Sequence, residues 1–198
     1  MENSQGTLNL NENYKKNQMR EKKKVGKSTF GASKLFPFIQ NISEKQKHWV
    51  AGFIEGEGST NISFKKQKNM KIGLRPCASF SVTQHCTRVK SLEIVQTTLG
   101  GIGRIYPKPG KTQVMVYEVT KISHLHTIII PFLEKYNYLS SRKTELLTFK
   151  IVVEQMVSKN HCTIKGLKDI INIVFLNALN SSNRKFTKEE LLSFIKNF

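Results

Sequence analysis

The sequence predicts an α+β fold in which helices cover one face of a single antiparallel sheet and leave the other face open and polar. Two observations carry this expectation. Segments in which apolar and polar residues alternate occur in two pairs, which is the pattern of half-buried strands. A helical segment precedes each pair, so the order reads helix, two strands, helix, two strands, helix, helix, an αββαββα unit with extra C-terminal helices.

The first helix of this unit is predicted over SEKQKHWVAGFIEGE, residues 43–57, where Ser43 and Gln46 have the spacing of a capping box. The stretch WVAGFIEGEG then holds three glycines. Each glycine inside a helix costs about 1 kcal/mol relative to alanine, so their presence needs a compensating use. Gly52 and Gly56 share one helix face beside Ala51. Such a face lets two helices approach closely, although packing on the chain's own sheet would also explain it.

Two strands are predicted next, TNISFKK at residues 60–66 and KIGLRPCASFSVTQ at residues 71–84. Their alternation places a set of apolar residues on the buried face: Ile62, Phe64, Ile72, Leu74, Ala78, Phe80 and Val82. A set of polar residues falls on the opposite face: Asn61, Ser63, Lys65, Lys71, Arg75, Ser79, Ser81 and Thr83. We expect the two strands to pair and to leave this polar face open.

The remaining elements are predicted from changes in the spacing of the apolar residues along the chain. From Thr87 the period is that of a helix, and Gly100 follows as a stop signal. GRIYPK and TQVMVYEV are predicted strands that the turn KPGK joins into a hairpin. Further helices are predicted around residues 125–133 and over 142–156. Two short helical patterns end the chain at 166–179 and 187–198, the second opened by a Thr187 and Glu190 capping box.

The 198 residues are enough for one ordinary domain with extensions. Residues 1–42 are polar, include the basic run REKKKVGKS, and are predicted to form a largely disordered basic arm. We interpret this arm either as a contact to DNA phosphates or as a solubilising tail. Residues 43–180 are the predicted main domain, and residues 181–198 a helical extension of it.

The charge balance is strongly basic, because 32 Lys and Arg against 14 Asp and Glu give a net charge of +18. This excess is typical of a protein with a polyanionic partner, and nucleic acid is favoured over an anionic membrane surface. The apolar run HTIIIPFL is too short to cross a bilayer and contains Pro131, so no membrane contact is expected. The polar first thirty or so residues argue against a signal peptide. Three cysteines without a CxxC pair indicate neither a disulfide framework nor a zinc site.

Glu57 is the candidate metal ligand. It lies at the C-terminal end of the first predicted helix, where the helix dipole disfavours a carboxylate. Gly56 and Gly58 flank it and leave it unshielded by side chains. A carboxylate in this position favours a cation, and Mg²⁺ typically combines one or two carboxylates with substrate phosphates. A divalent metal site at Glu57 is therefore expected.

These residues carry a resemblance to a known family. VAGFIEGEG, residues 50–58, is similar to the LAGLIDADG motif of homing endonucleases, with glutamates for its aspartates and Val50 for its first leucine. FSVTQH and IIIPFLEKYNYLSSRKTELLTFK resemble the segments that follow the motif in single-motif members, and the resemblance covers residues 44–180. The organisation is most similar to the homodimeric, intron-encoded enzymes of organellar ribosomal RNA genes.

The resemblance implies an endonuclease that makes a double-strand break in a long, pseudo-palindromic DNA site and leaves 3′ overhangs. Two copies of the motif helix would pack through Trp49, Ala51, Gly52 and Gly56 and bring two Glu57 carboxylates together. Glu57 and the Gly56 carbonyl would bind Mg²⁺, for which Mn²⁺ can substitute. The metal would activate water and stabilise the leaving 3′ oxygen.

The resemblance also assigns catalytic and DNA-binding residues. Gln84 matches the position that orients the attacking water, and Arg88 one that supplies positive charge to the phosphate pocket. For a further basic residue the segment SSRK offers Lys143, which we favour, and Arg142. The resemblance implies that the sheet is curved and saddle-like. DNA contacts are expected on its open face and its connections, from Asn61, Ser63, Lys65, Lys66, Lys71, Arg75, Ser79, Ser81, Thr83, Arg104, Tyr106, Lys108, Lys111 and Gln113.

Two other functions stay open. An intron RNA maturase would use the same fold on RNA without cutting DNA, and a non-catalytic DNA-binding protein would show no metal-dependent nicking. The intact Glu57 and Gln84 favour cutting. Lysine outnumbers arginine 26 to 6, and Asn and Ile are abundant, a bias that AT-rich codons produce. This bias indicates an organellar or similar genome, and we expect a soluble protein of an organelle, a chloroplast or a mitochondrion.

Overall fold

The computed structural model describes residues 42–67, 72–136, 142–176 and 184–196, all within one compact unit, residues 35–198. The first elements are α3 (Glu44–Glu57), β1 (Gly58–Lys66), β2 (Leu74–His85), the 3₁₀ turn η2 (Cys86–Arg88), α4 (Val89–Thr98), β3 (Arg104–Pro107) and β4 (Val114–Val119). The next are α5 (Ile122–His124), the π-helical turn η3 (Leu125–Ile129), α6 (Ile130–Lys135) and α7 (Arg142–Val157). The 3₁₀ turn η4 (Asn160–Cys162), α8 (Ile164–Leu176) and α9 (Lys188–Lys196) complete the order.

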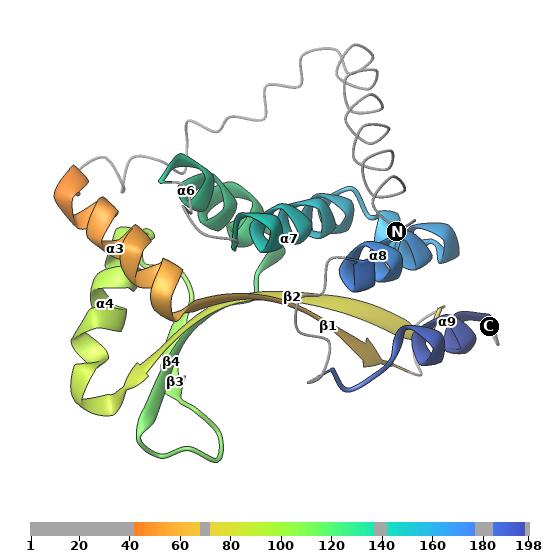
Figure 1. Ribbon diagram of the computed structural model, residues 1–198, viewed down its shortest axis with the longest axis horizontal. Helices are drawn as coiled ribbons and strands as arrows, with labels where there is room; N and C mark the ends of the chain where they lie inside the picture. The colour runs from red at the N-terminus through yellow and green to blue at the C-terminus, as the bar shows by residue number, and fades with distance from the viewer. Residues whose placement is uncertain (1–41, 68–71, 137–141, 177–183, 197–198) are drawn as a thin grey trace, which may run out of the picture. The chain divides into compact units, whose positions relative to one another are not determined.

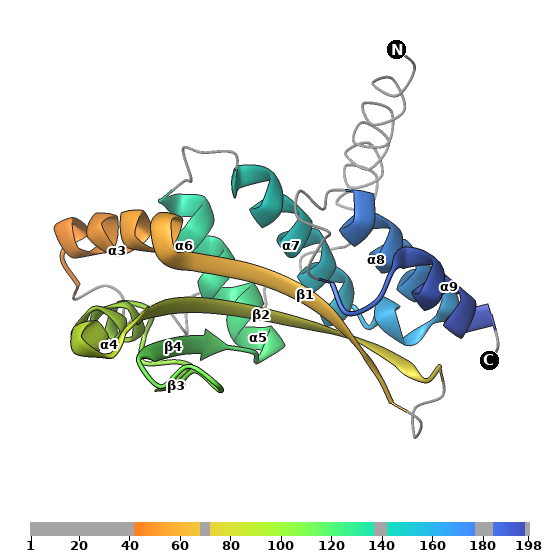
Figure 2. The same cartoon turned by 60° about the horizontal axis from the view of Figure 1, so that its bottom comes forward.

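The strands form one four-stranded antiparallel sheet in the order β1-β2-β4-β3, which confirms the predicted α+β class. In Figure 1 the helices α6, α7 and α8 lie along one side of the long β1–β2 pair. Figure 2 shows β1 and β2 bending along their length, with the shorter β4 and β3 beside β2 near the end that α3 enters. The sheet is therefore curved and carries its helices on one face.

The core lies between this sheet face and the helices. Six of the seven apolar residues predicted to face inward on the first two strands are buried: Ile62, Phe64, Leu74, Ala78, Phe80 and Val82. The seventh, Ile72, lies in the turn before β2 and is only partly buried. Phe80 meets Tyr117 of β4 edge to face, with ring centroids 6.3 Å apart. Burial raises the pKa of Tyr117, whose hydroxyl has no hydrogen-bond partner among the described residues. The predicted alternation of the strands is thus confirmed on the buried side.

Of the two predicted capping boxes, the one at α9 forms completely and the one at α3 forms only in part. At α9, Glu190 N–H donates to Thr187 Oγ1 at 3.2 Å, and Thr187 N–H donates to the Glu190 carboxylate at 2.7 Å. At α3, Gln46 N–H donates to Ser43 Oγ at 3.2 Å, but the Gln46 side chain donates to Thr98 Oγ1 of α4 at 2.9 Å. The Gln46 amide therefore links α3 to α4 instead of closing the capping box.

The helix predicted around residues 125–133 contains the wide turn η3, which the apolar periodicity did not predict. Pro131, just beyond this turn, has no N–H to donate, and a single π-helical turn inside a helix is the usual form of this irregularity. As for membranes, every helix in the described ranges is too short or too polar to span one.

Candidate nucleic-acid interface and metal site

The helix α3 leads directly into β1, so its last residue, Glu57, stands at one end of the sheet. Gly58 N–H donates to the Ile54 carbonyl and closes the helix. A Cβ atom on Gly58 would lie 2.5 Å from the Ile54 oxygen, so glycine is required there by the chain's own packing. Gly56 and Glu57 are both exposed. The junction therefore leaves the Glu57 carboxylate open to solvent.

Gly52 and Gly56 have a different environment. A Cβ atom added to either would meet no heavy atom within 4 Å among the described residues outside their own helix backbone. Trp49 shares their side of α3, is 45% exposed, and stacks on Phe53 with ring centroids 5.2 Å apart. Ala51 is half-buried at the border of this face. Packing within the described chain therefore gives no use for the two glycines, in contrast to Gly58.

Arg142, the first residue of α7, holds the C-terminal end of α3. Its Nη1 donates to the carbonyls of Ile54, at 3.2 Å, and of Glu55, and its Nη2 donates to the carbonyl of Gly58. The last turn of α3 contains no basic residue, so Arg142 supplies the cation that a helix C-terminus favours. Arg142 Nε also lies 3.8 Å from the Glu145 carboxylate.

The two candidates for the further basic residue are thus placed differently. Arg142 contacts the helix that carries Glu57, whereas Lys143 is exposed and lines a hollow with Glu134 and Lys150 on the side of α6. The structure therefore places Arg142 against the end of α3 and Lys143 in the hollow beside α6. A catalytic role for either stays a prediction.

Gln84 lies at the end of β2, close to the α3–β1 junction. Val82 opposes Gly58 across the two strands, and Gln84 follows two residues later on the same side of the pleat. Its side-chain oxygen accepts from His85 N–H at 2.9 Å, which leaves the NH₂ group to donate elsewhere. Arg88 is exposed one turn further on. Glu57 and Gln84 thus come from adjacent segments, and their catalytic roles stay predictions.

His85 is a candidate that sequence reasoning missed. Its Nδ1 accepts from Thr87 N–H at 3.4 Å and lies 2.9 Å from Thr87 Oγ1, so it caps the turn η2. Its Nε2 lies 3.4 Å from Gln113 Oε1, in the connection between β3 and β4. The sequence gives only a weak signal, a histidine where Ser, Thr, Asp or Asn is the usual cap.

On the open face of the sheet, polar side chains lie opposite one another on neighbouring strands. Across β1 and β2 the opposed pairs are Asn61 with Ser79, Ser63 with Cys77, and Lys65 with Arg75. A further row crosses all four strands through Ser59, Ser81, Glu118 and Arg104, and Thr83 follows on β2. Lys65 and Arg75 are both exposed, and like charges directly opposite each other destabilise a sheet. An anion bound between them would remove that cost.

The face continues along β3 into its hairpin. The Tyr106 hydroxyl donates to the Glu118 carboxylate at 2.9 Å, and burial, together with this bond, raises the pKa of Tyr106. Lys108, Lys111 and Gln113 are exposed in the hairpin connection. Lys111 N–H donates to the Lys108 carbonyl at 3.0 Å, and the turn between them contains Gly110 at a φ of 75°, a backbone conformation that favours glycine.

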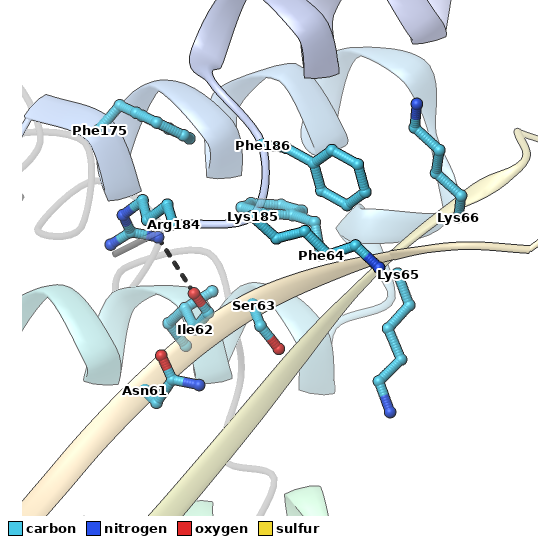
Figure 3. A pocket seen from close by; sticks show the side chains of 10 residues that line it. All are labelled: Asn61, Ile62, Ser63, Phe64, Lys65, Lys66, Phe175, Arg184, Lys185 and Phe186. Atoms are coloured by element: carbon cyan, nitrogen blue, oxygen red, sulfur yellow. Dashed lines mark hydrogen bonds between the residues drawn. The ribbon is translucent and has the colours of Figure 1, made fainter. Parts of the chain in front are cut away.

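Lys66 and Lys71 were also predicted to contact DNA. Lys66 does not join the open face, because its Nζ lies 4.9 Å and 4.8 Å from the ring centroids of Phe186 and Phe194. Figure 3 shows Lys66 and Lys65 pointing to opposite sides of β1. The aromatic residues of the C-terminal segment therefore hold Lys66 on the helix side. Lys71 lies outside the described residues.

The outer edge of β1 is partly covered by residues 184–186. Arg184 Nη1 donates to the Ile62 carbonyl at 3.2 Å, and its guanidinium lies 5.1 Å from the Phe175 ring centroid. A cavity of about 770 Å³ lies between the strand and this segment, with Lys185 and Phe186 on its far wall (Figure 3). Burial lowers the pKa of Arg184. The segment therefore shields an edge strand from unwanted pairing.

A metal site could be built here only in part by one chain. Among the described residues, no three His, Cys, Asp or Glu side chains gather closely enough to hold an ion. The junction offers the Glu57 carboxylate and the Gly56 carbonyl as oxygen donors, while Arg142 engages the carbonyls of Ile54, Glu55 and Gly58. Such oxygens suit Mg²⁺, provided that further oxygens come from a second copy or from phosphates.

Comparison with known proteins agrees with this geometry. The family model described as LAGLIDADG endonuclease matches residues 50–153. The chain is 33% identical over 147 residues to Probable intron-encoded endonuclease 3 of Neurospora crassa, a match that covers 71% of this chain but only 27% of that protein. It is 32% identical over 162 residues to DNA endonuclease I-CeuI of Chlamydomonas moewusii, covering 78% of this chain and 71% of that one.

Two solved structures have the same architecture. Group I intron-encoded homing endonuclease I-CeuI complexed with DNA matches with a TM-score of 0.71 at 28% identity, over 95% of this chain and 92% of that one. Archaeal intron-encoded homing endonuclease I-Vdi141I complexed with DNA matches with a TM-score of 0.70 at 32% identity, over 78% of this chain and 96% of that one.

Proposed function

Because this chain belongs to the LAGLIDADG endonuclease family, we propose that it is an intron-encoded homing endonuclease, which makes a double-strand break in a long, pseudo-palindromic DNA site and leaves 3′ overhangs. The observation that carries the proposal is the α3–β1 junction, where the exposed Glu57 carboxylate stands at the end of a polar sheet face. Metal-assisted hydrolysis of DNA requires this combination of a metal ligand and a duplex-binding surface.

The open sheet face is the proposed DNA surface. Asn61, Ser63, Ser79 and Ser81 carry short donors and acceptors suited to base edges in the major groove. Lys65 and Arg75 add positive charge for bases or phosphates. Thr83, Arg104, Tyr106, Lys108, Lys111 and Gln113 extend the same surface toward the hairpin. A curved sheet of this kind follows the groove, so many contacts of moderate strength together give a long recognition site.

The working enzyme is proposed to be a homodimer. Gly52 and Gly56 carry no side chain, and nothing in the described chain packs against them. A second copy of α3 packed through Trp49, Ala51 and the two glycines would use this space, because small residues permit close helix contact. The two Glu57 carboxylates would then come together at the centre of the DNA site, one for each strand.

The Glu57 carboxylate and the Gly56 carbonyl are the proposed ligands of Mg²⁺, which Mn²⁺ can replace. Their oxygen chemistry fits a hard divalent cation, and two copies together with DNA phosphates would complete the ligand set. When bound, the metal supplies a more acidic water and charge stabilisation at the leaving oxygen. The carboxylates also place negative charge beside the phosphates, which the surrounding basic residues must offset.

The other site residues are assigned by what they can reach. Gln84 would orient the attacking water through its NH₂ group, since its amide oxygen is held by His85 N–H. Arg88, exposed at the end of the same turn, would contribute positive charge beside the phosphate. Arg142 would act as a positioning residue that fixes the end of α3, and Lys143 is proposed as a basic group at the margin of the site.

The test is incubation of the purified chain with duplex DNA that spans the uninterrupted insertion site of the intron. Cleavage at one position on each strand, in Mg²⁺ or Mn²⁺ and not in EDTA, is the expected result. Tight binding without cutting in either metal would contradict the proposal and indicate a DNA-binding protein; selective binding of intron RNA would indicate a maturase. An organellar host, in keeping with the codon bias and the intron-encoded relatives, is part of the same proposal.

A further inference from the structure

We infer that His85 is a positioning residue that couples the β3–β4 hairpin to the catalytic turn at the end of β2. The inference rests on the proposed function, because it concerns how DNA contact at the hairpin reaches Gln84 and Arg88. The proposed chemistry gives no role to the His85 imidazole. One imidazole bonds on one side to the turn η2 and on the other to Gln113 of the hairpin connection.

The contacts fix the tautomer of His85. Thr87 N–H can only donate, so Nδ1, 3.4 Å away, must be an acceptor and carry no proton. The Thr87 hydroxyl, 2.9 Å from the same nitrogen, can donate to it as well. The proton therefore sits on Nε2, which faces Gln113 Oε1 at 3.4 Å and donates to it. Both nitrogens of the neutral ring are thus matched to their partners.

The position of the ring determines what this link does. Gln84 precedes His85 directly and uses its amide oxygen on His85 N–H, while Arg88 ends the turn that His85 caps. Cys86 N–H donates to the Gln113 carbonyl at 2.9 Å, so Gln113 holds this turn through its main chain as well as its side chain. When DNA engages the hairpin, a shift of Gln113 is carried through the imidazole to the residues on either side of it.

Two substitutions of His85 separate this role from simple capping. His85→Asn keeps an acceptor that can cap Thr87 N–H, because Asn is among the best N-cap residues, but it is too short to reach Gln113. His85→Ala removes both contacts. His85→Asn should retain DNA affinity within about twofold and lose roughly tenfold in the single-turnover cleavage rate at saturating DNA. A wild-type rate for His85→Asn would overturn the inference and leave only a local cap.

Gln113→Ala completes a double-mutant cycle. If His85 acts through Gln113, the double variant His85→Asn/Gln113→Ala should cut no more slowly than the slower single variant. Rate losses that multiply would show two independent roles and contradict the coupling. Because His85 and Gln113 are both exposed, none of these variants is expected to unfold the chain.

Amide hydrogen exchange gives a readout that does not require cutting. In the free wild-type chain, the amides of Cys86 and Thr87 should be protected, and DNA binding should protect them further. In His85→Asn the protection in the free chain should persist, but the additional protection on DNA should be lost. A chain that bound DNA, showed this pattern and never cut would refute the proposed function and keep the coupling. An identical response to DNA in both proteins would refute the coupling alone.

Discussion

Arg142 Nη1 donates to the main-chain carbonyl of Ile54 at 3.2 Å, across 88 residues of sequence. The same guanidinium donates to the carbonyls of Glu55 and Gly58, so one side chain of α7 contacts the chain on both sides of Glu57. A planar group with several donors can satisfy such a set of carbonyls, whereas an ammonium cannot do so with the same geometry. The orientation of Glu57 is therefore expected to depend on Arg142.

Arg142→Lys tests this dependence. The variant keeps the charge and loses the fork of donors, so it should lose about 1–3 kcal/mol of unfolding free energy, in the range of hydrogen bonds to charged groups. Cleavage should fall with it. Denaturant unfolding measures the first effect. Lys143→Ala, one residue on and exposed, is the control and should stay within about 0.5 kcal/mol of wild type. An unchanged Arg142→Lys protein would contradict the positioning role.

Substituting two glycines of the motif, Gly52 and Gly58, should have opposite effects on the stability of the chain. Gly52→Leu removes the smooth face without meeting any described neighbour in its own chain, and leucine is the better helix former by roughly 0.8 kcal/mol. The variant should therefore stay folded, become monomeric in light scattering, and lose cleavage. Gly58→Ala should instead lower stability, because its Cβ would collide with Ile54. A Gly52→Leu protein that remained dimeric would remove the proposed interface.

The strands could be predicted from the alternation of apolar and polar residues along the sequence. Each strand has one buried and one open face, so alternation alone identified Ile62 and Phe64 as core and Asn61 and Lys65 as surface, and burial confirms it. The capping residues Ser43 and Thr187 were likewise local signals, and both cap their helices. Where an element depends only on its own sequence, the prediction holds.

The interactions that sequence alone could not give are those between distant segments. Lys66 has an ordinary surface sequence, and only the fold of the C-terminal segment brings Phe186 and Phe194 to it. The adjacent positions of Arg142 and Lys143 in SSRK do not distinguish them, whereas the contact of Arg142 with Ile54 depends on how α7 packs. His85 was overlooked for the same reason, since its partner Gln113 comes from another strand connection.

Lys65 and Lys66 form a matched pair on opposite sides of β1. Lys65→Ala should weaken DNA binding and reduce the slope of log affinity against log salt by about 0.9, the value for one phosphate contact. Lys66→Ala should leave that slope unchanged and lower the unfolding free energy by roughly 1 kcal/mol, because its ammonium lies over aromatic rings. Binding measured at several salt concentrations, with thermal unfolding alongside, checks both. Equal salt slopes for the two variants would refute the assignment of faces.

An ionised carboxylate at the N-terminal end of α3 should make the stability of the fold depend on pH in the acid range. Glu44 accepts from Lys47 Nζ and from the Tyr136 hydroxyl, each at 2.9 Å, and these bonds, that of Lys47 first, lower the pKa of Glu44. A lowered pKa in the folded state means that the contribution is present above the unfolded value and is lost as pH falls through the folded value. Comparing wild type with Glu44→Gln at neutral pH and at about pH 3 should show a smaller difference in stability at the acid pH. An equal gap at both values would contradict it.

Glu57→Gln separates an enzyme from a binding protein. The substitution keeps the size of the side chain and removes the charge that a divalent cation requires, so cleavage should fall by about 10² or more. Binding to the same site should survive, since the contacts of the sheet face lie elsewhere and one negative charge beside the phosphates is gone. Single-turnover cleavage and equilibrium binding measured on one duplex give both quantities.

Glu55→Gln is the matched control for that experiment, two residues before Glu57 in the same motif. Glu55 is partly buried and its carbonyl is engaged by Arg142, so its side chain is not assigned to the metal, and its substitution should leave the cleavage rate within a few-fold of wild type. Calcium provides a second check, because it accepts oxygen ligands in looser geometry than magnesium and should support a bound, uncut complex. If Glu57→Gln cut at the wild-type rate while Glu55→Gln did not, the metal would belong to the other carboxylate, and the active centre would have to be rebuilt around Glu55.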